Sequence, residues 1–463
     1  MPGPAIDVCC GSAGVTARGD EVMQNVPPSD LIGDSRRAFL ARAAAIAGTT
    51  IFFGCETYSA KGQPVPAAGA MAKLGKDEPI KMGVIGTGGM GTGHCGSICD
   101  LAKKGLCNVQ IVALADVCQP RLEAARKLCS DKQAGMTVDT YTDHRKLLAR
   151  PDLHGVLIAS PEHWHSQHAI DAILAGKDVY CEKPMTLNLP MALRLREVCQ
   201  KNPQVIFQFG TQYVNYQRYM EAKKLIESGA IGKPVMSQTS YCRNSRDGEW
   251  LYYGIDPKWE PGKNLDWDEW CRPLGKAPWD PEIYARWRRY RKYSTGIIGD
   301  LLVHWMTPMM MALNQGWPVR VIANGGHYVD KKMENHDTVL LAAEFEKEHT
   351  MLVTGATTNE TGLETVIHGK KANIYLGGRN CVMRPEPTYD KEVEPVTIEC
   401  KEDMDPQDKH RLAWFNSIRT RELPRANIEL GTMVMVIVDL ATRGMWDGHA
   451  YTFDPKTMTA TRV

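Results

Sequence analysis

Short apolar runs and segments with helical periodicity alternate along the chain between residues 80 and 210. The apolar runs are continuous, which is typical of strands buried on both faces of a parallel sheet. Between them, apolar residues recur every three or four positions, as on one face of a helix. The expected strands are 82–85, 111–115, 155–160, 178–181 and 205–209, and the expected helices are 92–104, 119–133, 166–175 and 189–200. This alternation predicts an α/β domain with a doubly wound parallel sheet.

The pattern changes after residue 210, where strand-like runs follow one another with few helices between them. Strands are expected at 235–242, 320–323, 338–345, 350–354, 365–368 and 372–376, and helices at 215–228, 408–420 and 429–443. We predict a second, α+β domain over 211–463, built on an open-faced mixed or antiparallel sheet. Because an apolar sheet face needs cover, a homodimer or homotetramer is expected.

A glycine-rich turn follows the first expected strand and contains Gly86, Gly88, Gly89, Met90 and Gly91. Gly86 permits a tight turn, Gly88 lets the backbone approach a pyrophosphate, and Gly91 lets helix and strand pack closely. The second strand ends at Asp116, whose carboxylate would accept hydrogen bonds from ribose hydroxyls and repel a 2′-phosphate. Strand, turn, helix, strand and acid together predict a Rossmann domain at 80–210 that binds NAD rather than NADP.

Polar residues follow two further strands of this domain. Ligands of open α/β sheets bind at the carboxyl ends of the strands. We therefore assign to the cofactor site Ser160, Pro161, His165, Glu182 and Lys183. His165 is expected to face the nicotinamide from its strand end, with Trp164 as packing and His163 as a structural residue.

Composition excludes several classes of function. Apolar residues make up 43% and charged residues 24% of the 463 residues, and the formal net charge is +1. Such a balance gives no reason to expect nucleic acid or an anionic membrane as a partner, and no apolar stretch is long enough for a membrane span. Eleven of the 14 cysteines follow Cys55 without paired metal-ligand spacing. We expect free, buried thiols and no metal site.

The first 79 residues have the pattern of a leader rather than of a folded domain. Arg36-Arg37 precede Phe39-Leu40 and a modest apolar segment, which predicts a twin-arginine signal over 1–55 and export to the periplasm. The alternatives are the end of an ordinary amphipathic helix, translation that starts at Met23, and lipid attachment at Cys55. Glycine and proline in 56–79 predict a flexible linker.

Two features of the second domain carry candidate chemistry. Asp300 and His304 are four residues apart and would share one face of a helix. Taken alone, they fit a helix N-cap and a core histidine better than a catalytic pair. A tryptophan cluster over 250–287 is interpreted mostly as core or interface, with Trp287 and Arg288 as the best candidates for stacking on a sugar.

Three separated motifs together resemble the Gfo/Idh/MocA oxidoreductases over about residues 80–460: the glycine fingerprint, Glu182-Lys183-Pro184, and Gly299-Asp300-x-x-x-His304. Members of that family pair a Rossmann domain with an open-sheet domain, and they oxidise sugars or cyclitols with NAD or NADP. The resemblance implies catalytic roles for Lys183, Asp300 and His304, and substrate contacts from Lys183 and His304. The leader and the tryptophan-rich insertion resemble the exported branch of the family.

These residue types suit the oxidation of a secondary alcohol. A histidine with an ordinary pKa of about 6.5 can accept the hydroxyl proton near neutral pH. We therefore expect His304 to be the base, Asp300 to orient it or relay its proton, and Lys183 to position the hydroxyl and stabilise developing negative charge. A retained, recycling NAD would suit an exported enzyme.

Two other functions stay open. Some relatives are NAD-dependent glycosidases, such as α-N-acetylgalactosaminidases, which oxidise a sugar transiently, eliminate the aglycone and then reduce the product. The intact Glu182-Lys183-Pro184 favours a dehydrogenase over that branch. A non-catalytic protein that holds NAD is the other alternative, and the presence of Lys183, Asp300 and His304 together argues against it.

Overall fold

The computed structural model describes residues 69–463. The expected twin-arginine signal around Arg36-Arg37 and the cysteine at 55 lie outside the described residues. Of the expected linker, residues 69–79 are described, and up to residue 79 they form no regular helix or strand. They are nonetheless attached to the first domain, because Gly69 N donates to Leu174 O at 2.7 Å and Lys73 O lies 3.0 Å from His154 Nε2.

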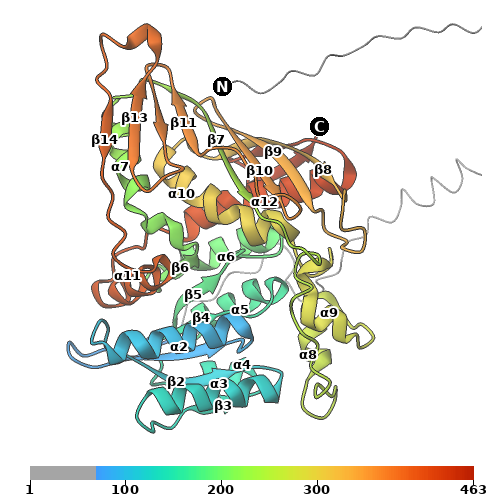
Figure 1. The fold of residues 1–463 in the computed structure, drawn as a ribbon. Coiled ribbons are helices and arrows are strands. Elements are labelled where there is room, and N and C mark those ends of the chain that lie inside the picture. Colours follow the sequence, from blue (N-terminus) through green and yellow to red (C-terminus); the bar gives the residue numbers. More distant parts are fainter. Residues whose placement is uncertain (1–68) are drawn as a thin grey trace, which may run out of the picture. The chain divides into compact units, whose positions relative to one another are not determined.

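The N-terminal domain is built on a six-stranded parallel sheet in the order β3-β2-β1-β4-β5-β6 (Figure 1). Its strands are β1 (Ile80–Ile85), β2 (Val109–Ala115), β3 (Asp139–Tyr141), β4 (Gly155–Ile158), β5 (Asp178–Glu182) and β6 (Phe207–Gly210). Its helices are α2 (Gly89–Lys103), α3 (Gln119–Lys132), α4 (His144–Leu148), α5 (Glu162–Leu174) and α6 (Leu189–Lys201). This strand order is that of a Rossmann fold, so the prediction of a doubly wound sheet is confirmed.

Two helices of this domain begin earlier than the hydrophobic pattern indicated. Helix α5 starts at Glu162 rather than at residue 166, and α2 starts at Gly89 rather than at 92. Pro161 is the N-cap of α5, with φ −63° and ψ 155°. His163, Trp164 and His165 therefore lie in the first turn and a half of a helix, and not on a strand end.

The second sheet has ten strands in the order β14-β13-β12-β11-β7-β10-β9-β8-β15-β16. They are β7 (Pro234–Cys242), β8 (Pro318–Gly326), β9 (Thr338–Phe345), β10 (His349–Ala356), β11 (Val366–Gly369), β12 (Ala372–Tyr375), β13 (Cys381–Pro385), β14 (Val396–Ile398), β15 (Tyr451–Asp454) and β16 (Thr459–Arg462). Strands β7 and β10 pair in parallel and the other pairs are antiparallel, so the sheet is mixed, as predicted. The four strands at its two ends, β13 to β16, were not expected from the sequence.

Helices cover one face of this sheet and join it to the first domain (Figure 1). They are α7 (Gln217–Glu227), α10 (Val303–Leu313) and α12 (Ile428–Asp447), and α11 (Pro406–Thr420) packs against α2. One hydrophobic cluster contains Met185 and Phe209 of the first domain together with Met435 of α12. The two domains therefore share a core.

Between β7 and α10 lies an insertion with two short helices, α8 (Trp267–Cys271) and α9 (Pro281–Arg286). The insertion has its own apolar cluster, which contains Trp267, Trp270, Tyr284 and Trp287. The interpretation of most of the tryptophans as core residues is thereby confirmed. None of the described helices is both long and apolar enough to cross a membrane, and the eleven cysteines of the described part are free thiols.

The glycine turn depends on two positions that cannot carry a side chain. Gly86 has φ +88°, and a Cβ there would lie 2.5 Å from Ser160 N. A Cβ on Gly91 would lie 1.8 Å from Gly86 O, well inside contact distance. These two glycines let α2 begin directly against the turn and against the residues after β4.

We expect Gly91→Ala to destabilise the first domain, by about 1–3 kcal/mol or more, because its methyl group must displace backbone atoms. Gly96→Ala is the matched control in the same helix, since its Cβ meets only Leu128 at 3.7 Å. That control should stabilise the protein by roughly 0.5–1 kcal/mol. Denaturant unfolding measures both changes, and equal stabilities for the two variants would contradict this account of the turn.

Candidate functional site

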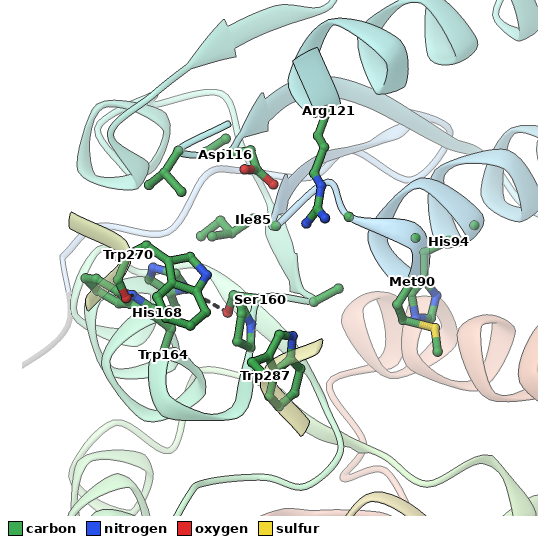
Figure 2. A pocket seen from close by; sticks show the side chains of 18 of the residues that line it. Ile85, Met90, His94, Asp116, Arg121, Ser160, Trp164, His168, Trp270 and Trp287 are labelled. Carbon is green, nitrogen blue, oxygen red and sulfur yellow. Dashed lines mark hydrogen bonds between the residues drawn. The ribbon is translucent and has the colours of Figure 1, made fainter. Parts of the chain in front are cut away.

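A cavity of about 430 Å³ lies at the carboxyl edge of the first sheet. The glycine turn, Asp116, the residues after β4 and part of the insertion line it, and Trp270 of the insertion lies beside Trp164 (Figure 2). Seven of the residues assigned to the cofactor from sequence line this cavity: Gly86, Gly88, Gly89, Met90, Asp116, Ser160 and Pro161. Gly91 supports the turn from behind.

The cavity has the properties that a dinucleotide requires. The N-terminus of α2 opens onto it, with Gly88 as N-cap and no side chain that caps the first amides. Free amides at a helix N-terminus are ready-made donors for phosphate oxygens. Gly89 has open space where a Cβ would lie, so the backbone is accessible there. The residues present thus fit a pyrophosphate at this turn.

Asp116 at the end of β2 is held by the turn that it follows. Its Oδ2 accepts from Thr87 N at 2.6 Å and from Thr87 Oγ1 at 3.1 Å, and its Oδ1 accepts from Cys118 N at 2.8 Å. A carboxylate has about four acceptor positions, so it can still receive a ribose hydroxyl. These hydrogen bonds hold the Asp116 carboxylate at the end of β2, where the fingerprint has its acidic residue.

Arg121 is a pocket residue that sequence reasoning missed. Its guanidinium carbon lies 4.7 Å from the ring centroids of both Trp259 and Tyr284, so the insertion holds it in place. A Cβ on Gly88 would lie 3.4 Å from Arg121 Nη1, which puts this cation beside the glycine turn. The position of Arg121 beside the glycine turn could not be predicted from the sequence, because Trp259 and Tyr284, which hold it, are far from Arg121 along the chain.

Trp164 and His168 also line the cavity, one turn apart on α5. Their rings stack with centroids 4.5 Å apart, and His168 Nδ1 lies 3.0 Å from Ser160 Oγ (Figure 2). His168 Nε2 is buried without a hydrogen-bond partner in the described part of the chain. The i, i+4 spacing in the sequence could have identified this pair once α5 was known to start at Glu162.

Besides Gly91, three assigned cofactor residues lie outside the cavity lining, and this corrects their expected placement. His165 is buried, with Nδ1 2.7 Å from Pro184 O and Nε2 2.7 Å from Ser160 O. Both ring nitrogens are thus occupied by backbone carbonyls, and the ring ties together the chain segments after β4 and β5. The other two residues, Glu182 and Lys183, belong to a polar cluster behind the cavity.

Glu182 is buried between charged and polar groups. Its Oε1 lies 2.8 Å from His94 Nε2, whose Nδ1 accepts from Arg411 Nε at 2.9 Å, and its Oε2 accepts from Lys183 N at 3.1 Å. Burial alone would raise the pKa of Glu182, but the hydrogen bond from His94 and the charge of Lys183 outweigh it and lower the pKa to about 2. Glu182 is therefore a fixed negative charge beneath Lys183.

Lys183 and Asp300 meet across the two domains. Lys183 Nζ lies 2.8 Å from Asp300 Oδ1 and 3.0 Å from Asp300 O, and Arg288 Nε donates to the same Oδ1 at 2.8 Å. Burial raises the pKa of Asp300, but the two cations more than compensate and hold it well below its usual range. Asp300 lies in a π-helical turn, Ile298–Leu302, that leads into α10.

The expected pair between Asp300 and His304 is not formed. In the described structure the carboxylate contacts Lys183 and Arg288, and no hydrogen bond joins it to His304. The prediction assumed a regular α-helix, in which positions four apart share a face, whereas Asp300 lies in the π-turn and His304 in α10. Asp300 therefore orients the cations rather than the histidine.

His304 is enclosed, and its acidity differs from the expected value. Its Nδ1 is buried without a partner among the described residues, and the rings of Tyr213 and Tyr241 lie with centroids 5.6 Å and 6.3 Å away. Burial, together with the charge of Lys183, lowers the pKa of His304 to about 3, instead of about 6.5. The ring is neutral at physiological pH.

Two of the four predicted substrate residues line the cavity, and the other two, Lys183 and His304, do not. Trp287 and Arg288 both line the cavity, and the Arg288 guanidinium lies 4.2 Å from the Trp287 ring centroid. Arg288 also binds Asp300, so it links the nucleotide cavity to the cationic cluster. In the described part of the chain, no three histidine, cysteine or acidic side chains are arranged to hold a metal ion.

Comparison with known proteins matches both domains to one family. Residues 80–210 match the model described as "Oxidoreductase family, NAD-binding Rossmann fold", and residues 275–453 match "Oxidoreductase family, C-terminal alpha/beta domain". Inositol 2-dehydrogenase from Pseudomonas savastanoi pv. phaseolicola is 35% identical over 170 residues, which is 37% of this chain and 48% of that protein. The chain thus spans about half the length of the curated relatives that it matches.

Solved structures share the fold at low identity. An NAD-binding oxidoreductase from Klebsiella pneumoniae superposes with a TM-score of 0.61 at 19% identity, over 81% of this chain and 98% of that one. Levoglucosan dehydrogenase in complex with NADH and L-sorbose superposes with a TM-score of 0.60 at 17% identity, over 83% and 99% of the two chains. Together with the two family models, whose matches cover more than half of the sequence, this shows that the chain belongs to the Gfo/Idh/MocA oxidoreductases and that its N-terminal domain is an NAD-binding Rossmann fold.

Proposed function

We propose that the protein is an NAD-dependent oxidoreductase that acts on a secondary hydroxyl of a sugar, glycoside or cyclitol. The observation that carries the proposal is the contact of Lys183 with Asp300, since each domain supplies one of these residues and the nucleotide cavity adjoins them. The relatives support the substrate class, because one is an inositol 2-dehydrogenase and another is a levoglucosan dehydrogenase.

The chain's residues suit the proton transfer that accompanies hydride transfer. The glycine turn and Asp116 would hold NAD, which would supply the hydride acceptor. Lys183 would donate a hydrogen bond to the substrate oxygen and stabilise its negative charge, while Asp300, which is itself bound by Arg288, holds the ammonium group in place. The neutral His304 ring would accept the hydroxyl proton.

The low pKa of His304 shifts part of this work to Lys183. A base is most effective when its pKa lies near the working pH, and a pKa of about 3 is far below it. The cation of Lys183 must therefore lower the pKa of the bound hydroxyl, so that the proton can leave to a weak base. Glu182 beneath Lys183 and Asp300 beside it prevent the repulsion that unpaired cations would cause.

Export and assembly are further parts of the proposal. The sequence around Arg36-Arg37 supports export to the periplasm by the twin-arginine route, and a tightly held NAD would suit that location. The uncovered face of the second sheet supports a homodimer or homotetramer. On neighbouring positions of β8, β9 and β10 it carries Ile322, Leu340, Ala342 and Leu352, of which Leu340 is 54% exposed.

We expect Asp116→Asn to weaken the preference for NAD over NADP, because the negative charge that repels a 2′-phosphate is removed. Isothermal calorimetry with both dinucleotides gives the ratio of affinities. Thr87→Val is the matched control, since it removes the hydroxyl that contacts Asp116 and leaves the charge. An unchanged ratio in Asp116→Asn, or tighter binding of NADP by the unmodified protein, would contradict the assignment.

We expect Lys183→Met and His304→Ala to lower kcat for the sugar or cyclitol and to keep the NAD content. Loss of a general base typically costs about 100- to 10,000-fold in rate. Because His304 is already neutral, its ionisation should add no limb to the kcat profile between about pH 5 and 8.

Lys177→Met is the control for these two variants. Lys177 is a buried lysine just before β5 and donates to the carbonyls of Arg150 and Leu153 at 2.8 Å and 3.0 Å. The Lys177→Met variant should have a lower melting temperature and an unchanged kcat. Turnover near the unmodified rate in Lys183→Met or His304→Ala would remove that residue from the mechanism.

We expect Leu340→Glu to dissociate the oligomer into monomers, because it introduces a charge into the uncovered sheet face. Sedimentation equilibrium measures the change in mass. Leu423→Glu is the control, since Leu423 is more exposed, at 74%, and lies in the loop between α11 and α12. A monomeric unmodified protein would refute the proposed assembly.

A further inference from the structure

Glu162 is a buried carboxylate that takes no part in the proposed hydride and proton transfer. It is the first residue of α5 and is fully buried. Its Oε1 accepts from Ser294 Oγ at 2.6 Å, and its Oε2 accepts from Thr295 N and from Thr295 Oγ1, both at 2.9 Å. All three donors belong to the second domain. These three hydrogen bonds, called the Glu162 grip below, join the first domain to the second close to the segment that carries Asp300.

The gripped residues are packed tightly against the π-turn. A Cβ on Gly299 would lie 1.9 Å from Thr295 Oγ1 and 3.1 Å from Pro184 Cγ. The Thr295 hydroxyl therefore fills the space over Gly299 while it donates to Glu162. From the other side, Asn335 Nδ2 donates to Ser294 O at 3.3 Å and to Arg288 O at 2.9 Å. A shift of residues 294–295 must move the turn that holds Asp300.

We propose that Glu162 is a positioning residue whose carboxylate, through Ser294 and Thr295, sets the π-turn so that Asp300 meets Lys183 and Arg288. The inference rests on the proposed function for its effect on turnover. It differs from a merely structural role, because the grip should act on the chemical step more than on folding or on NAD binding.

The charge state of Glu162 should govern this grip near neutral pH. Burial, together with the negative charge of Asp300, raises the pKa of Glu162 to about 7, against the hydrogen bonds from Ser294 and Thr295. The other charge that faces it is Arg288, and burial lowers the pKa of its helix neighbours His163, to about 3, and His165.

Protonation would disturb one specific contact. A protonated carboxyl group must donate its proton, so one of the two hydroxyls, Ser294 Oγ or Thr295 Oγ1, would have to accept from Glu162 and its own proton would lose its partner. Ser294 Oγ already accepts from Gly296 N at 3.0 Å. The ionised form satisfies every donor. We therefore expect kcat to fall as the pH decreases through about 7.

The test compares Glu162→Gln and Glu162→Asp with Asp178→Asn. Asp178 is the matched control, because it is a buried carboxylate whose pKa is also raised by burial and which accepts from Ile206 N at 2.7 Å. It lies at the amino end of β5, away from Lys183. Three quantities are measured for each variant: the NAD content, the pH profiles of kcat and KM, and the hydrogen exchange of peptides covering residues 294–302.

We expect Glu162→Gln to keep its NAD and its KM, to lose the limb near pH 7, and to have a kcat lowered by roughly 100-fold, the cost of a displacement of about 1 Å at a reacting site. Exchange over 294–302 should accelerate. Glu162→Asp keeps the charge and should retain the limb, and it provides the comparison if the glutamine variant does not fold. Asp178→Asn should lose stability only.

The proposal is overturned if Glu162→Gln retains the limb, if its loss appears in KM or in stability alone, or if exchange over 294–302 does not change. Hydrogen exchange needs no substrate, so it decides the positioning role by itself. An unmodified protein that oxidises no sugar, glycoside or cyclitol while Glu162→Gln accelerates exchange would refute the proposed function and leave the grip established.

Discussion

The buried ion pair between Lys183 and Asp300 is the constraint on which the rest of the site depends. Each group is less than 9% exposed, and a buried charge without its partner is costly, by about 3–5 kcal/mol when one member of a pair is removed. The two residues come from different domains, so the pair forms only when the domains share their apolar core. Met185, two residues after Lys183, supplies part of that core where it packs against Gly431 of α12. The segment 183–185 thus supplies both a member of the ion pair and part of the core between the domains.

The charged cluster around this pair contains two cations and two carboxylates. Lys183 and Arg288 share one carboxylate oxygen of Asp300, which leaves one positive charge in excess at that point. Glu182 reduces the excess from below and is itself bound by His94. A neutral His304 adds no further cation, because burial and the charge of Lys183 disfavour its protonated form. In the proposed reaction, this arrangement would stabilise a substrate oxygen that becomes negative and would not require a strong base.

The sequence predicted the parts that depend on local pattern. Strand β1, the glycine turn and β2 could be read directly, since their apolar runs and glycines act over a few residues. The end strands β13 to β16 are only three to five residues long, so any alternation in them extends over too few positions to predict a strand. The partner of Asp300 could not be predicted, because the π-turn breaks the helical spacing and its contacts with Lys183 and Arg288 depend on how three segments of chain fold together. The lowered pKa of His304 likewise follows from burial, which periodicity does not report.

The tryptophan-rich insertion lines part of the nucleotide cavity, and the sequence did not predict that contact. Its rings bury one another, and its backbone is joined to the first domain: Asp266 N donates to Val117 O, and Trp270 O accepts from Trp164 Nε1 at 2.9 Å and lies 2.8 Å from His163 Nε2. Each such hydrogen bond contributes about 0.5–1.5 kcal/mol, and moving the insertion away would also expose its aromatic rings. The insertion is therefore a built-in wall of the cavity rather than a lid. His163, which looked structural in the sequence, is one of the residues that hold this wall in place.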